Sequence, residues 1–165
     1  DADSLQTTGI INYMFDSPET NLGNLLACNT VTEFIQYTID DTEKVLITTN
    51  IQANFLPTGG NSANNLNISG QKDSGTNNGC FYLFGVLNDA PHTGTYDDIN
   101  FEDGNDTGIN ISECLRISEN NNTITYNITA LGAVGEYIDI NFSGGYEDYN
   151  GNPHTITGVI HVLRD

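Results

Sequence analysis

Residues 44–56, Lys-Val-Leu-Ile-Thr-Thr-Asn-Ile-Gln-Ala-Asn-Phe-Leu, alternate apolar and polar side chains along most of their length. A period of two residues indicates an extended strand with one face buried and the other exposed. The apolar parity holds Val45, Ile47, Ile51, Ala53 and Phe55, and the polar parity holds Thr48, Asn50, Gln52 and Asn54. This stretch therefore predicts one half-buried β-strand.

The same alternation recurs along the chain and predicts an all-β fold. Clusters of glycine, asparagine and proline separate the alternating segments, which is typical of an antiparallel sandwich or barrel. Residues 80–87 are apolar on both parities, which predicts a central strand covered on both faces. Helical signals occur at 17–28, where Ser17 can cap a short helix. About nine strands are expected, at 9–15, 31–39, 44–56, 65–70, 80–87, 108–118, 123–130, 137–142 and 155–163. We therefore expect an antiparallel β-sandwich, immunoglobulin-like or jelly-roll, with one short helix.

Length and charge bound the class of protein further. The 165 residues fit one domain, 1–165, in which residues 1–16 form a possible strand-donating segment. Four Lys and Arg against 22 Asp and Glu give a formal charge of −18. This charge argues against nucleic acid and anionic membranes as partners, because both are bound through cationic side chains. Salt screens such self-repulsion, so we expect a secreted or cell-surface protein without a membrane span.

The cysteines and the possible glycosylation sites leave alternatives open. Cys28, Cys80 and Cys114 allow one disulfide in any of three pairings, or three reduced thiols. Six asparagines fit the pattern Asn-x-Ser/Thr, namely Asn67, Asn105, Asn110, Asn121, Asn127 and Asn141. Four of them, Asn67, Asn110, Asn127 and Asn141, fall on the polar parity of expected strands and should face solvent.

Two acidic loops are candidate calcium sites, because Ca²⁺ takes six to eight oxygen ligands from flexible loops. The alternative is a pair of solvated acidic turns, since neither loop has EF-hand spacing. The candidate ligands are Asp97, Asp98, Glu102, Asp103 and Asp106 in the first loop, and Glu147, Asp148 and Asn150 in the second. Calcium is thus a possible cofactor, and no other is indicated.

Three tyrosines beside these loops suggest a carbohydrate site. Tyr96, Tyr146 and Tyr149 could stack on sugar faces, with the nearby carboxylates accepting hydrogen bonds. The alternative is that they cap the ends of the sandwich. Enzymatic activity is not expected, because His92, His154 and His161 fit no nucleophile or zinc spacing.

The N-terminal segment suggests assembly. Residues 6–15 are apolar on both parities, and such a segment can add to the edge of a neighbour's sheet or dock on its own. The assembly residues would be Ile10, Ile11, Tyr13, Met14 and Phe15. The leading interpretation is a non-enzymatic structural or adhesive subunit of a cell-surface filament, joined by strand addition to itself or to neighbouring surface proteins. The alternative is a calcium-assisted carbohydrate-binding module of a glycan-capture system.

The C-terminal part resembles a known group of domains. Gly94-Thr-Tyr, Gly135-Glu-Tyr-Ile-Asp-Ile-Asn-Phe-Ser-Gly-Gly and Asn152-Pro-His-Thr-Ile-Thr-Gly-Val-Ile-His-Val carry the likeness. On these segments, residues 64–165 resemble uncharacterised β-rich secreted or lipid-anchored domains of Bacteroidota. The resemblance implies a β-sandwich outside the cytoplasm and brings no catalytic residues.

Overall fold

A computed structural model describes residues 32–42, 44–58, 61–71, 80–87, 92–99, 107–111, 117–118 and 122–165. The chain divides into two units, and every described strand belongs to the second, Glu33–Asp165. The described residues contain no helix, and hence none long and apolar enough to cross a membrane. The expected helix at 17–28 and the expected strand at 9–15 lie outside the described residues.

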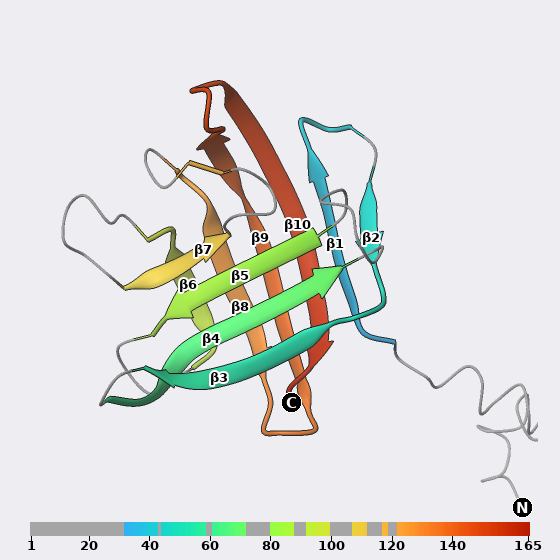
Figure 1. Cartoon of the computed structure of the whole chain (residues 1–165), viewed down its shortest axis with the longest axis vertical. Helices are drawn as coiled ribbons and strands as arrows, with labels where there is room; N and C mark the ends of the chain where they lie inside the picture. Colours follow the sequence, from blue (N-terminus) through green and yellow to red (C-terminus); the bar gives the residue numbers. More distant parts are fainter. Residues whose placement is uncertain are drawn as a thin grey trace, which may run out of the picture. The chain divides into compact units, whose positions relative to one another are not determined.

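The described strands form two antiparallel sheets (Figure 1). One has six strands in the order β2-β1-β10-β9-β8-β6, and the other has four in the order β3-β4-β5-β7. Figure 1 shows the four-stranded sheet crossing over the six-stranded one. The strands are β1 (Phe34–Ile39), β2 (Val45–Ile47), β3 (Gln52–Thr58), β4 (Asn61–Gln71), β5 (Cys80–Val86), β6 (Gly94–Asp97), β7 (Gly108–Ile111), β8 (Thr125–Leu131), β9 (Tyr137–Glu147) and β10 (Pro153–Leu163). The expected antiparallel all-β fold is therefore confirmed.

One hydrophobic core is shared by the two sheets. Phe81 of the four-stranded sheet lies between Tyr37 and Phe142 of the six-stranded sheet, with ring centroids 5.8 Å apart in both pairs. In β8 and β10 the alternation that predicted the strands also selects the core, because the apolar parity is the buried one. In β8, for example, Tyr126 and Ile128 are buried, as is Ile124 directly before it.

The expected single strand at 44–56 is wrong, because the chain changes sheets within it. β2 pairs with β1 in one sheet, and β3 pairs with β4 in the other. The break falls at Asn50, whose φ of 53° is left-handed, a conformation that asparagine tolerates better than most residues. The parity survives the break, since Ile47 and Ala53 are both buried.

Other boundaries also differ from expectation. Gly94–Asp97 forms β6, which was not predicted because four residues after a turn cluster are too short to show a pattern. β7 ends at Ile111, and beyond it Ile117 makes only an isolated bridge with Asp148. β9 and β10 are longer than expected because they form one hairpin, whose pairing extends to Glu147 and Pro153 on either side of the turn.

Two seams join the sheets. At one, the backbone N–H of Asp98 donates to the carbonyl of Ile124, and the N–H of Ile99 donates to that of Ile109 in β7. At the other, the N–H of Asp165 donates to the carbonyl of Ala53 in β3, and the Asp165 carboxylate accepts from the Ala53 N–H at 2.9 Å. The two sheets are thus joined by backbone hydrogen bonds at one edge between the residues after β6 and β7, and at the other between the C-terminal residue and β3.

Candidate functional site

The outward surface of the four-stranded sheet is the strongest candidate site. We call it the amide face, defined as Gln52 and Asn54 on β3, Asn67, Ser69 and Gln71 on β4, and Tyr82 and Phe84 on β5. The pairing register aligns six of these side chains in two rows across the strands, Gln52 with Ser69 and Tyr82, and Asn54 with Asn67 and Phe84. None of these seven residues carries a charge, although the chain as a whole carries −18.

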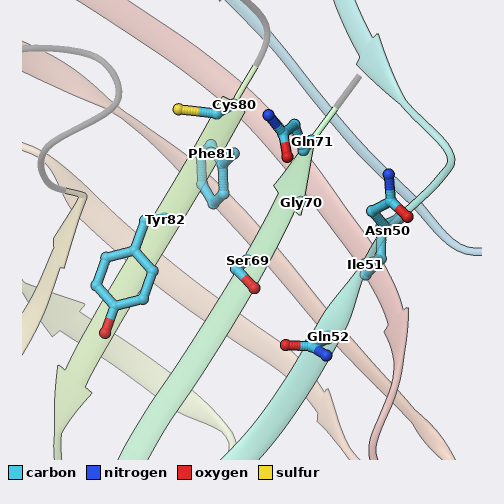
Figure 2. Close-up of a pocket in the computed structure, with 9 residues that line it drawn as sticks. All are labelled: Asn50, Ile51, Gln52, Ser69, Gly70, Gln71, Cys80, Phe81 and Tyr82. Carbon is cyan, nitrogen blue, oxygen red and sulfur yellow. The ribbon is translucent and has the colours of Figure 1, made fainter. Parts of the chain in front are cut away.

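The amide face is hollowed at one end. A depression of about 550 Å³ is lined by the first row together with Asn50, Ile51, Gly70, Gln71, Cys80 and Phe81. Figure 2 shows Gln52, Ser69 and Tyr82 on three neighbouring strands around it. A hollow of this volume falls in the range of roughly 300 to 1,000 Å³ typical of small-molecule sites. Hydroxyl and amide groups are therefore arranged around a space that can hold a ligand.

A hydrogen bond holds the aromatic ring of this hollow. The Tyr82 hydroxyl donates to Oδ1 of Asn67 at 2.8 Å, so the ring is held along the sheet surface. Both Tyr82 and Phe84 are half-buried, while the alternate residues Phe81 and Leu83 are fully buried in the core. Cys80 at the start of β5 is disulfide-bonded, and its partner lies outside the described residues, where the sequence holds Cys28 and Cys114. Of the two alternatives left open, three reduced thiols is therefore wrong.

The apolar residues of 80–87 are the one sequence feature that points to this site. Residues 80–87 are apolar on both parities, and we expected a strand covered on both faces. β5 does lie inside its sheet, between β4 and β7, but its second parity is only half-buried. Aromatic side chains on the parity of a strand that faces away from the core can indicate a binding surface. Tyr82 and Phe84 are such side chains.

The three tyrosines proposed as a sugar platform do not form one. Tyr146 is buried, and its ring stacks on His154 with centroids 5.2 Å apart. Tyr96 is half-buried, and its hydroxyl is hydrogen-bonded to His92, donating to the backbone carbonyl at 2.9 Å. Tyr149 alone is well exposed, at 61% of its surface, in the β9–β10 turn. The buried Tyr146 ring cannot stack on a ligand, so the platform is wrong.

The second acidic loop is stabilised by its own amides. The Asp148 carboxylate accepts from the backbone N–H groups of Asn150 and Asn152, both at 2.8 Å, and from their side-chain amides at 3.0 to 3.3 Å. These bonds, those to Asn152 first, hold the pKa of Asp148 well below its usual range. N–H donors thus occupy the oxygens of Asp148 that a calcium ion would need, and Glu147 lies at the end of β9.

The first acidic loop is described only at its start. Asp97 ends β6 as an exposed residue, and the carboxylate of Asp98 accepts from the hydroxyl of Tyr126 at 2.8 Å. Amides of Asn122 and Asn110 also donate to it, at 3.1 and 3.4 Å. Burial raises the pKa of Asp98, against the opposing effect of these donors. Among the described residues no three His, Cys, Asp or Glu side chains are arranged to hold a metal ion, while Glu102, Asp103 and Asp106 lie outside them. Calcium in this loop stays a prediction.

The Asn-x-Ser/Thr sites divide between exposed and covered positions. Asn127 and Asn141 face solvent as expected and are paired across β8 and β9. Asn110 is 4% exposed, so the expectation that it faces solvent is wrong. It is covered because its amide turns toward Asp98 at the seam between the sheets. Asn67 is half-buried, and its side-chain oxygen accepts a hydrogen bond from the hydroxyl of Tyr82.

A charged clamp holds the β9–β10 turn to the end of β1. Nδ1 of His154 lies 2.6 Å from Oδ2 of Asp40, and its Nε2 lies 3.7 Å from Oδ2 of Asp148. The hydrogen bond to Asp40 raises the pKa of His154, and the same bond lowers the pKa of Asp40. Burial, with the charges of Asp40 and Asp148, raises the pKa of Tyr146 to about 12. The clamp is a structural element at the opposite sheet from the amide face.

The clamp predicts a pH-dependent stability. The contribution of His154 is fully present below its unfolded pKa of 6.5 and is lost as the pH rises through the raised folded value. The contribution of Asp40 is present above its unfolded pKa of 3.8 and is lost as the pH falls through the lowered folded value. Asp40→Asn should therefore lower Tm most between pH 4 and 6.5, and much less at pH 9.

Thermal unfolding followed by circular dichroism at pH 5.5 and pH 9 checks this expectation. Asp40 and Asp41 both have left-handed φ, 50° and 52°, which asparagine also adopts, so Asp41→Asn is the matched control. An equal loss of Tm at the two pH values would show that the clamp is not ionic.

Comparisons with protein families, with curated proteins and with solved structures found no match for this chain.

Proposed function

We propose that this domain is a non-enzymatic binding module of the cell exterior, which holds a carbohydrate on the amide face and so acts as an adhesive subunit of a cell surface. The observation that carries the proposal is the uncharged composition of that face in a chain of charge −18. We infer that its two-sheet scaffold is an immunoglobulin-like or jelly-roll sandwich.

The chemistry of the face matches a neutral sugar. Sugar hydroxyls both donate and accept hydrogen bonds, as do the amides of Gln52 and Asn67 and the hydroxyl of Ser69. Sugar C–H faces pack on aromatic rings, and Tyr82 offers a ring held in place by Asn67. A ring fixed before binding loses little conformational entropy when the ligand arrives. The face therefore combines orientation by hydrogen bonds with an apolar contact area.

Two features favour a location outside the cytoplasm. Cys80 is disulfide-bonded, and disulfides persist in oxidising compartments. A formal charge of −18 is best tolerated where salt screens it. Both features agree with the secreted or lipid-anchored Bacteroidota domains that residues 64–165 resemble.

A glycan array tests the proposal, with neutral and anionic glycans on one surface. The wild-type protein should bind neutral glycans, and Tyr82→Ala should weaken that binding about tenfold to a hundredfold. This range takes the sugar contact to be worth as much as the stacking of a nucleic-acid base on an aromatic side chain, about 1 to 3 kcal/mol. Tyr82→Phe keeps the ring and loses only the bond to Asn67, so it should retain most of the affinity.

Tyr149→Ala is the matched control, because Tyr149 is exposed on the β9–β10 turn and not on the amide face. It should bind like the wild-type protein. An array without any binding, or a loss in Tyr149→Ala equal to that in Tyr82→Ala, contradicts the proposed function.

Assembly by strand addition is less favoured by the described edges. β2 has three residues, and β6 is bridged to β7 through Asp98 and Ile109. On the open side of β3, Asp165 already pairs with Ala53, and Pro57 has no N–H to donate. Phe55 is the remaining position of β3 that could bond an added strand. The assembly residues Ile10, Ile11, Tyr13, Met14 and Phe15 lie outside the described residues, so this interpretation stays a prediction.

A further inference from the structure

The two rows of the amide face repeat the same arrangement. In the first row, the ring of Tyr82 on β5 is followed by the hydroxyl of Ser69 on β4 and the amide of Gln52 on β3. In the second row, the ring of Phe84 is followed by the amides of Asn67 and Asn54. Each row therefore places one aromatic ring beside two hydrogen-bonding side chains.

The spacing of the rows is set by the sheet. Residues i and i+2 of a strand lie about 7 Å apart on the same face, and neighbouring strands lie about 4.8 Å apart. Tyr82 and Phe84 are therefore successive rings along β5. The hydrogen bond from Tyr82 to Asn67 links the two rows, because its donor belongs to the first row and its acceptor to the second.

The second row contains an unused hydrogen-bond acceptor. Oδ1 of Asn54 is buried and has no hydrogen-bond partner among the described residues. Such a buried acceptor costs about 1 to 3 kcal/mol when it stays unsatisfied. Rotation of the Asn54 amide toward the surface would let a ligand hydroxyl donate to it and remove that cost.

We propose that the amide face holds two consecutive sugar residues of an extended neutral glycan, which lies along β5 with one residue at Tyr82 and the next at Phe84. This inference rests on the proposed carbohydrate-binding function and defines its ligand class. Glycans with uronic acid or sulfate groups are excluded as ligands, because the face offers no cation and the chain repels anions.

A length series of oligosaccharides tests the two-row arrangement. Cello-, laminari- and malto-oligosaccharides of one to six residues are titrated into the full chain by calorimetry, with polygalacturonate as the anionic probe. Affinity should rise at least tenfold from the monosaccharide to the disaccharide or trisaccharide of the series that binds, and then level off. Polygalacturonate should not bind.

Phe84 variants separate the second row from the first. Phe84→Ala should remove the gain from the second sugar and leave monosaccharide affinity within about twofold of wild type. Phe84→Leu keeps an apolar side chain for packing and lacks a flat ring, so it should behave like Phe84→Ala if stacking is the cause. Circular dichroism and Tm confirm that both variants fold.

The outcomes distinguish this inference from the proposed function. Binding that depends on Tyr82, but is equal for one and four sugars and unaffected by Phe84, overturns the two-row arrangement alone. Binding of polygalacturonate overturns the neutral ligand class. No binding by any oligosaccharide overturns both the inference and the function on which it rests.

Discussion

Gly144→Ala is expected to unfold the domain. Gly144 lies in β9, and a Cβ atom there would overlap the carbonyl oxygen of Thr123 and the backbone nitrogen of Ile124. Those atoms belong to the chain that enters β8 and cannot rotate away as a side chain could. We expect a loss of more than about 4 kcal/mol, a large part of the roughly 5 to 15 kcal/mol that stabilises a typical domain.

The neighbouring glycine is the matched control. A Cβ at Gly145 would meet Oγ1 of Thr123 at 3.3 Å, and this side chain can turn aside. Gly145→Ala should therefore cost less than about 1 kcal/mol. Urea unfolding monitored by circular dichroism measures both variants, and a Gly144→Ala protein with wild-type stability would show that the entry to β8 does not pack on β9 as described.

Asp98→Ala is expected to have the second largest effect on stability. It removes the carboxylate that accepts from the hydroxyl of Tyr126, a fully buried core residue, and from the amides of Asn122 and Asn110. An unsatisfied buried donor costs about 1 to 3 kcal/mol. Because Asp98 also lies at the seam between the sheets, we expect a loss of about 3 kcal/mol.

A double-mutant cycle identifies the cause of that loss. Tyr126→Phe removes the buried hydroxyl, so Asp98→Ala should cost less in the Tyr126→Phe background than in the wild-type protein. The four proteins are compared by urea unfolding. Strictly additive losses would mean that the Tyr126 hydroxyl does not depend on Asp98.

The alternation of side chains predicted much of the fold because burial in a strand depends on parity alone. Ile124, Tyr126 and Ile128 hold the apolar parity of the expected strand at 123–130, and all three are buried. The break at Asn50 could not be predicted, because the apolar parity continues across it and only the left-handed φ of Asn50 shows where the chain changes sheets. β6 was missed for a different reason, since its four residues, Gly94–Asp97, are too few to show an alternation.

The candidate site was harder to predict than the fold. Acidic residues and tyrosines are frequent in this chain, so their clusters in sequence say little about which side chains meet in space. Asp98 illustrates this, because its partners Asn122 and Tyr126 come from another part of the chain. The amide face depends on the register of β3, β4 and β5, which is set by the turns between the strands as well as by the hydrophobic pattern. The alternation alone does not show how those turns align the strands. The apolar residues on both parities of 80–87 were the one feature of the sequence that pointed to the amide face.

The absence of charge from the amide face means that repulsion between copies and contacts made by that face depend on different side chains. Carboxylates elsewhere on the chain keep copies apart and hydrated, and their influence shrinks as the ionic strength rises. Contacts made through amides, hydroxyls and rings have no such dependence. The affinity of the amide face for an uncharged ligand would therefore be the same at low and at high ionic strength.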